Sequence, residues 1–215
     1  MKNIIIVGAG EFGQEISEWL EDIIERDATI RIGGYLDDGL AVVDKLNDSY
    51  PYPLLGKIAN YYPRDEDFFV IAIGNPAVKM QVVNCLKQRS ANFFNLIHPS
   101  VVIARTATLG TGVIMCPFSL ASVHCVIEDF VTINAYSSIG HNAYIGEGVT
   151  ISSHVDITGN VRVNNGVFIG SNASVLPSVE IGIAAKIGAG SMVLKKVSAY
   201  TTTYTLPVRS LLNDQ

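Results

Sequence analysis

The stretch IGHNAYIG, residues 139 to 146, holds a histidine between two isoleucine-glycine steps that stand six residues apart. Histidine is the side chain whose charge ordinarily changes near neutral pH, so His141 is eligible as a general base that takes a proton from a reacting amine or hydroxyl. Histidine at an exposed turn is also common without any function. Residue type alone therefore leaves both interpretations of His141 open.

A second candidate site is the sequence GAGEFG, in which Gly8, Gly10 and Gly13 satisfy the dinucleotide fingerprint GxGxxG. Asp37 and Asp38 follow at the distance of a ribose-binding acid. By itself this pattern predicts NAD binding. Backbone N–H groups at a helix N-terminus bind phosphate whichever nucleotide carries it, so another nucleotide fits the loop as well.

Composition excludes several other classes of function. The net charge is −5 and no Lys/Arg run interrupts it, so we expect neither nucleic acid nor an anionic membrane as a partner. The apolar run before Gly8 is too short for a signal peptide or a membrane span, which predicts a cytoplasmic protein. Three cysteines without a CxxC spacing predict neither a disulfide framework nor a metal site.

The elements that position the glycine loop lie in residues 1 to 95. The β-branched run Ile4 to Val7 is typical of a strand covered on both faces, and Ile16 and Leu20 have helical spacing in the segment that follows. We therefore predict a half-Rossmann-like domain, an α/β parallel sheet. Its further elements are strands at 30–36, 68–73 and 93–97 and a helix at 77–89.

The element that positions His141 is a repeat with a period of six. Seventeen hexads run without an insertion from Ile97 to Val193, with an apolar residue at each first position and Ala, Val, Ser or Cys four residues later. Neither a helix nor an ordinary strand has this period. The repeat predicts a hexapeptide β-helix for residues 96–198, followed by a C-terminal tail at 199–215.

Three hexads make one triangular coil, so each residue stacks on its equivalent three hexads away in the sequence. His141 then lies between Val123 and Gly159, and the glycine leaves an open notch beside the histidine. His124, Asn142 and Asn160 form a polar column next to it. This arrangement alone still leaves the function of His141 open.

Several motifs, taken in order, give the chain a resemblance to a known family. They are GAGEFG, LDD at 36–38, IAIGN at 71–75, NLIHPS at 95–100, SSIGH at 137–141 and IGAGS at 187–191. Together they resemble the bacterial sugar acetyltransferases of the left-handed β-helix class, which include nucleotide-amino-sugar N-acetyltransferases and sialic acid O-acetyltransferases. The resemblance covers nearly the whole chain.

The resemblance implies an acetyl-CoA-dependent enzyme that needs no metal. The family's general base falls on His141, and Asn142 stands where well-matched members carry an acidic residue. An amide orients the imidazole but cannot stabilise imidazolium as a carboxylate does. The CoA-contacting positions fall on Thr150, Ser171 and Ala189, and the resemblance implies a homotrimer with each site between neighbouring β-helices.

The family's nucleotide-sugar site falls on the glycine loop and its surroundings. Gly10, Glu11 and Phe12 match the phosphate and sugar contacts, Asp37, Asp38 and Gly74 match the nucleoside contacts, and Asn134 is a candidate sugar contact. We therefore expect an N-acetyltransferase that acts on a nucleotide-linked amino sugar in surface-glycan synthesis.

Three alternatives remain at the sequence level. The first is an O-acetyltransferase acting on sialic acid or a related sugar, although a free sugar needs no nucleoside pocket. The second is a non-catalytic, nucleotide-sensing scaffold, which Asn142 favours. The third is an NAD oxidoreductase, which leaves the β-helix unexplained.

Overall fold

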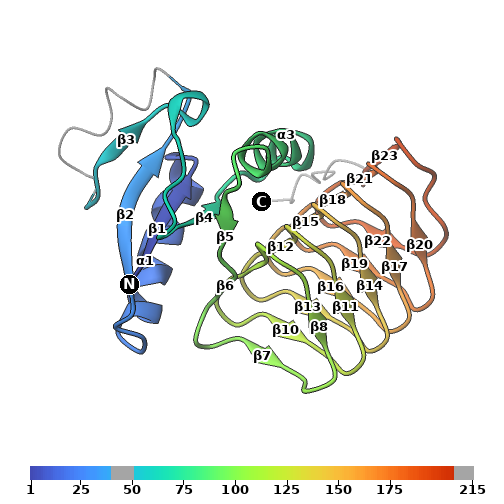
Figure 1. Cartoon of the computed structure of the whole chain (residues 1–215). Helices are drawn as coiled ribbons and strands as arrows, with labels where there is room; N and C mark the ends of the chain where they lie inside the picture. Colours follow the sequence, from blue (N-terminus) through green and yellow to red (C-terminus); the bar gives the residue numbers. More distant parts are fainter. Residues whose placement is uncertain (40–50, 206–215) are drawn as a thin grey trace, which may run out of the picture.

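The computed structural model describes residues 1–39 and 51–205, and within these ranges the chain forms an α/β part followed by a β-helix (Figure 1). The α/β part contains a parallel sheet in the order β3-β2-β1-β4-β5. Its elements are β1 Lys2–Val7, α1 Glu11–Ile24, β2 Ile30–Leu36, β3 Leu54–Gly56, the 3-10 helix η1 Ile58–Asn60, β4 Asp67–Ile71, α3 Pro76–Lys87 and β5 Asn92–Phe93.

Strand β1 is apolar on both faces because a helix covers each side of it. Ile4 and Ile6 pack with Ile16 and Leu20 of α1, whereas Ile5 and Val7 belong to a second cluster on the other side. That second cluster includes Val83 and Leu86 of α3. The structure thus confirms the predicted α/β parallel sheet.

The predicted strand at 93–97 is wrong as a single element. Asn92–Phe93 closes the sheet, and Leu96–Ile97 already pairs with the β-helix. Asn95 causes the break, because its side chain donates to Gly110 O at 2.8 Å and accepts from Val113 N at 3.1 Å, which ties the chain to the first coil.

The β-helix consists of two-residue strands that recur every six residues, and the predicted hexad repeat is confirmed. The strands are β6 Leu96–Ile97, β7 Val102–Ile103, β8 Thr108–Leu109, β9 Ile114–Met115, β10 Leu120–Ala121, β11 Val126–Ile127, β12 Thr132–Ile133, β13 Ser138–Ile139, β14 Tyr144–Ile145, β15 Thr150–Ile151, β16 Asp156–Ile157, β17 Arg162–Val163, β18 Phe168–Ile169, β19 Ser174–Val175, β20 Glu180–Ile181, β21 Lys186–Ile187, β22 Met192–Val193 and β23 Thr202–Thr203.

These strands stack into three parallel sheets, which we call faces 1, 2 and 3. Face 1 holds β6, β9, β12, β15, β18, β21 and β23; face 2 holds β7, β10, β13, β16, β19 and β22; face 3 holds β8, β11, β14, β17 and β20. The register advances by three hexads per coil, as Leu120 pairs with Ser138 and Ser138 with Asp156. The interior is a single apolar core of aliphatic and small residues, as the repeat predicts.

The β-helix continues past the point where the sequence predicts a tail. Strand β23 pairs with β21, with Lys186 N donating to Thr201 O and Gly188 N donating to Thr203 O, each at 2.8 Å. These hydrogen bonds pair the outer edge of β21, so that β23 adds one more strand to face 1. The remainder of the predicted tail, from residue 206, lies outside the described residues.

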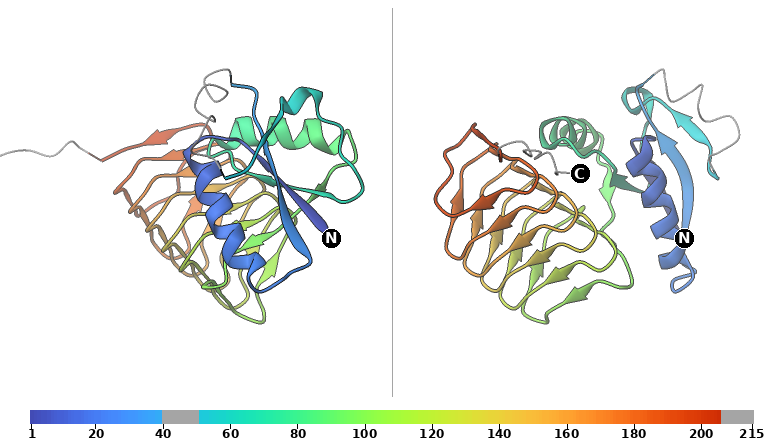
Figure 2. Two further views of the ribbon diagram at one scale, coloured as in Figure 1. Left: turned by 90° about the vertical axis from the view of Figure 1, so that its left-hand side faces the viewer. Right: turned by 180° about the vertical axis from the view of Figure 1, so that it is seen from behind.

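The α/β part lies along face 1, with α3 beside the coils (Figures 1 and 2). On α3, the Lys79 ammonium donates to the Thr132 and Thr150 hydroxyls, at 3.1 and 2.9 Å, and to Val149 O at 3.1 Å. On the α1 side, the core of the α/β part continues into Leu96 and Ile114 of the first coils. Face 1 is therefore the docking surface of the α/β part.

Candidate functional site

His141 lies at the corner between faces 2 and 3, in the turn that joins β13 to β14. Its side chain is exposed. Its backbone carbonyl accepts from Asn160 N at 2.9 Å, and Asn142 N donates to Val123 O at 3.0 Å, so backbone bonds to the coils on both sides hold the turn.

The imidazole of His141 lies directly over Gly159. A Cβ atom built on Gly159 would fall on the Nε2 edge of the ring, so any larger residue there would displace the imidazole. The stacking of His141 over a glycine, derived from the three-hexad period, is confirmed. The notch gives Nε2 a defined position at the surface.

The partner of the imidazole is the amide of Asn142. Asn142 Nδ2 lies 3.0 Å from His141 Nδ1. When the amide donates to Nδ1, the neutral ring carries its proton on Nε2; when the amide turns its oxygen to Nδ1, the ring donates there and Nε2 becomes the free base. The Asn142 amide therefore accommodates both tautomers, whereas a carboxylate would favour the second.

The glycine loop follows β1 at the carboxyl edge of the sheet. The chain continues from β1 to β2 on one side of it, and β4 pairs with β1 on the other side. Strand β1 lies between β2 and β4, so the crevice beyond β1 and β4 is the switch point at which open α/β sheets bind ligands. Gly8 has φ +104°, and a Cβ there would collide with Ala72 O. At Gly10 and Gly74 a Cβ would meet open space, so these two positions leave backbone accessible to a ligand.

Asp37 has a structural role in this crevice that the sequence did not predict. Its Oδ2 accepts from Ala9 N in the glycine loop and its Oδ1 accepts from Gly39 N, both at 2.7 Å. Asp37 thus ties the end of β2 to the loop, while Asp38 is exposed beside it. A nucleoside contact by Asp37 would have to share a carboxylate that already holds the loop.

The two side chains that follow Gly10 point to different environments. Glu11 is exposed at the start of α1. Phe12 is half-buried, and its ring meets Trp19 edge-on at 6.3 Å between centroids. Phe12 is therefore part of the packing around α1, and Glu11 places a negative charge beside the loop.

Two of the three positions expected to contact CoA lie together. Ser171 and Ala189 stack one coil apart at the corner between faces 1 and 2, where Gly190 N donates to Ser171 O at 2.8 Å. Asn134 lies at the same corner, and its Nδ2 donates to Ile151 O at 3.1 Å. Thr150 differs, because its side chain is buried on face 1 and accepts from Lys79.

Lys79 is the buried charge that sequence reasoning missed. In the sequence it has the appearance of an ordinary lysine in a helix, and it is buried only because α3 packs on face 1. Desolvation by burial lowers its pKa to about 7. No pattern in the sequence identifies this contact, because its acceptors lie far along the chain, in the β-helix.

A single chain does not bring the predicted site residues together. His141 and Asn142 lie at the corner between faces 2 and 3, which is the corner away from face 1, whereas the glycine loop lies in the part that docks on face 1. Ser171, Ala189 and Asn134 lie at the third location, the corner between faces 1 and 2.

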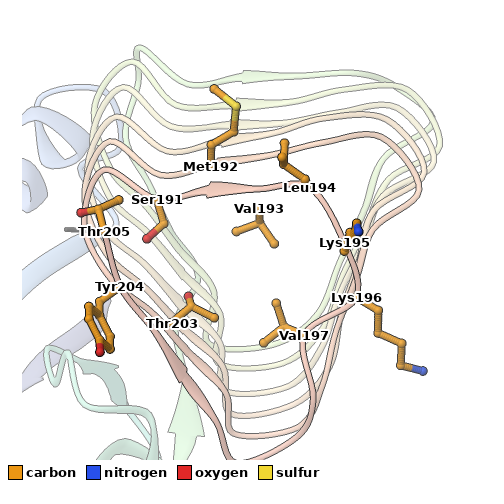
Figure 3. Close-up of a pocket in the computed structure, with 10 residues that line it drawn as sticks. All are labelled: Ser191, Met192, Val193, Leu194, Lys195, Lys196, Val197, Thr203, Tyr204 and Thr205. Carbon is orange, nitrogen blue, oxygen red and sulfur yellow. The ribbon is translucent and has the colours of Figure 1, made fainter.

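A hollow of about 410 Å³ lies at the C-terminal end of the β-helix and is lined by residues 191–197 and 203–205. Figure 3 shows Val193, Val197 and Thr203 pointing into the interior of the last coil. Ser191 Oγ and Thr203 Oγ1 are buried there without a partner among the described residues. The hollow is the open end of the core, far along the axis from the coil of His141.

Among residues 1–39 and 51–205, no group of three or more His, Cys, Asp or Glu side chains is arranged to hold a metal ion. Within the same ranges, no helix has the length and apolar character needed to cross a bilayer.

The fold and these surfaces define a class: an α/β domain with a glycine loop at its switch point, joined to a hexapeptide β-helix with an exposed histidine in a notch. Two protein-family models match the chain in this order. The PglD N-terminal domain matches residues 3–86, and the bacterial transferase hexapeptide, with six repeats, matches residues 124–159. The α/β part is therefore similar to the PglD N-terminal domain, and the middle of the β-helix is similar to bacterial hexapeptide transferases.

Two characterised proteins are similar to parts of the chain. The chain is 30% identical over 117 residues to UDP-N-acetylbacillosamine N-acetyltransferase of Bacillus subtilis (strain 168). The aligned region covers 54% of this chain and 51% of that protein. It is 28% identical over 153 residues to GDP-perosamine N-acetyltransferase of Escherichia coli O157:H7. The aligned region covers 66% of this chain and 63% of that protein. The chain therefore spans between about half and two thirds of the curated relatives it matches.

One solved structure extends the likeness to the whole fold. PerB from Caulobacter crescentus, in complex with CoA and GDP-perosamine, superposes with a TM-score of 0.81 at 21% identity, covering 94% of this chain and 93% of that one. At this identity the likeness establishes the fold.

Proposed function

We propose that this protein transfers the acetyl group of acetyl-CoA to the amino group of a nucleotide-linked amino sugar. The observation that carries the proposal is the combination of an open glycine loop at a sheet switch point with an exposed histidine held over Gly159 on a hexapeptide β-helix. Both curated relatives carry names of N-acetyltransferases that act on nucleotide amino sugars.

In the proposed reaction His141 is the general base. Its Nε2 takes a proton from the acceptor amine as the amine nitrogen attacks the thioester carbonyl of acetyl-CoA. The tetrahedral intermediate collapses with cleavage of the C–S bond, and the CoA sulfur takes the proton back from the imidazolium. The products are an amide and free CoA, and no covalent enzyme intermediate forms.

Asn142 is the positioning residue in this scheme. With its amide oxygen turned to Nδ1, it holds the ring in the tautomer whose Nε2 accepts a proton. Because Asn142 is uncharged, it stabilises imidazolium less than a carboxylate would. An amine that arrives neutral is a good nucleophile and tolerates this weaker support better than a hydroxyl, which favours N-acetylation over the O-acetylation alternative.

The proposal includes a homotrimer in which each site forms between two β-helices. The distance between the corner of His141 and the docking surface of the glycine loop requires a second chain if both act on one substrate. Exposed apolar side chains gather on face 2 and its corners, which suits contact with another copy. They are Val102, Phe118, Leu120, Val123, Tyr136, Met192 and Leu194.

The nucleotide-sugar portion is assigned to the crevice of the glycine loop, with Gly10, Glu11, Asp38 and Gly74 as contacts. The acetyl-CoA portion is assigned to Ser171 and Ala189 at the corner between faces 1 and 2. An N-acetylated nucleotide sugar is an activated glycosyl donor, so the product would serve the synthesis of a surface glycan in the cytoplasm.

The test is thiol release from acetyl-CoA with a panel of acceptors. The panel contains UDP-, GDP- and dTDP-linked 3-amino and 4-amino sugars, together with free and CMP-linked sialic acid. We expect turnover of one amino-sugar nucleotide, reduced about 10²- to 10⁴-fold in the His141→Ala variant. Turnover of sialic acid alone would establish the O-acetyltransferase, and absence of both turnover and CoA binding would favour the non-catalytic scaffold.

A further inference from the structure

A pocket of about 280 Å³ lies where the α/β part meets the β-helix, and the proposed function has not used it. Its lining comes from both parts of the chain: Asn75 and Pro76 at the start of α3, and Phe168 and Lys186 from strands β18 and β21 of face 1. A pocket shared between two domains is a common position for a ligand site.

The pocket begins where α3 ceases to cover face 1. The first residues of successive strands on this face form one column, which runs Thr132, Thr150, Phe168, Lys186. Lys79 covers the first two through its hydrogen bonds. Phe168 and Lys186 lie beyond that contact, so their side chains are available to a ligand entering beside α3.

The pocket also adjoins the crevice of the glycine loop. Residues Ala72 to Asn75 connect the carboxyl end of β4 to α3, and Gly8 of the loop packs against Ala72 O. Gly74, where a Cβ would meet open space, lies next to Asn75 in the pocket wall. Gly74 therefore connects the crevice to the wall of the pocket that Lys186 also lines.

The side chains around the glycine loop are acidic, so an anionic ligand there would meet no compensating positive charge unless Lys186 takes part. The glycine loop supplies backbone N–H groups but no basic side chain, and Glu11, Asp37 and Asp38 place carboxylates around it. Lys186 is exposed, and among the residues that the structure describes no carboxylate lies within ion-pair distance of it. An ammonium in this pocket would compensate the charge of a phosphate group.

We propose that Lys186 binds a diphosphate group in this pocket and that Phe168 packs against the attached ring. This inference rests on the proposed function, because both the nucleotide sugar and CoA contain a diphosphate. The position beside Gly74 favours the nucleotide sugar, since that edge of the sheet is the nucleotide crevice. Ser171 and Ala189, three residues after Phe168 and Lys186, bring the CoA positions to the neighbouring corner.

The test is calorimetric titration of the full-length wild type and of Lys186→Gln with UDP, GDP and dTDP, with the corresponding nucleosides, with CoA and with pantetheine. We expect Lys186→Gln to weaken the tightest-binding nucleoside diphosphate by about tenfold, and to leave nucleoside and pantetheine binding unchanged, because only the phosphate contact is lost. Arg26→Gln is the control, since Arg26 is an exposed cation at the opposite end of α1 from the glycine loop.

The outcomes separate this inference from the proposed function. A loss confined to CoA would support a diphosphate site and assign it to the cofactor. Wild-type binding of nucleoside diphosphate and CoA that Lys186→Gln leaves unchanged, or an equal loss in Arg26→Gln, would overturn the role of Lys186 while leaving the transferase intact. No binding of either ligand by the wild type would overturn both.

Discussion

At the scale of single residues, the pair His141 and Asn142 concentrates the chemistry of the proposed reaction. The notch over Gly159 positions the ring, and the amide of Asn142, 3.0 Å from Nδ1, accommodates either neutral tautomer. The amide gives orientation without charge. The strength of the base is therefore the property that a change at position 142 should alter most.

We predict that Asn142→Asp strengthens the base, because a carboxylate beside Nδ1 stabilises imidazolium. The acidic limb of the kcat/KM profile should move up by about one pH unit, and the rate on the plateau should rise. The measurement is kcat/KM for the acceptor sugar from pH 5.5 to 9, with acetyl-CoA at a saturating concentration. An unchanged acidic limb would mean that His141 is not the group that loses its proton in the reaction.

At the scale of elements, Lys79 joins α3 to face 1 and makes the docking of the two parts depend on pH. Burial lowers its pKa to about 7 from an ordinary 10.5, with desolvation as the cause. Between these two values the unfolded chain binds more protons at this site than the folded chain does. Stability should therefore rise as the pH increases from about 7 towards 10.

We predict that Lys79→Met removes this contribution, so that the melting temperature changes less between pH 7 and pH 9.5 than in the wild type. Lys87→Met is the control, because Lys87 lies on the same helix with a side chain that is 43% exposed. Thermal unfolding followed by circular dichroism at several pH values measures the difference. Equal pH dependence in the wild type and in Lys79→Met would contradict the account of the interface.

At the scale of the whole molecule, the proposed site needs more than one chain. Face 2 carries Leu120, 38% exposed, next to the stacked rings of Phe118 and Tyr136, whose centroids lie 5.0 Å apart. We predict that Leu120→Glu converts the proposed trimer to monomers and abolishes turnover, because a carboxylate would be buried in the contact. Light scattering coupled to gel filtration gives the mass.

Ile183→Glu is the matched control for this prediction, since Ile183 is 49% exposed at the corner between faces 3 and 1. It should remain trimeric and active. A wild type that is monomeric and still turns over substrate would contradict the shared site, and so would an active Leu120→Glu monomer.

The sequence predicts the repeated parts of this molecule better than its contacts between parts. The hexad period fixes which residues stack, so the position of His141 over Gly159 follows from counting three hexads along the chain. Packing of α3 on face 1 has no such period, and neither the burial of Lys79 nor that of Thr150 could be predicted. The hydrogen bond that Ala9 N donates to Asp37 depends on the local geometry of the glycine loop, and motif spacing does not predict it.

Acetyl transfer to the amino group of the sugar is tested most directly by identifying the product formed from isotopically labelled acetyl-CoA and the acceptor that the panel selects. We predict that mass spectrometry finds the labelled acetyl group on the sugar, that hydroxylamine does not remove it because it is an amide, and that the His141→Ala variant forms far less product. A hydroxylamine-labile ester would contradict N-acetylation, and label that stays on CoA with every acceptor would contradict the transferase itself.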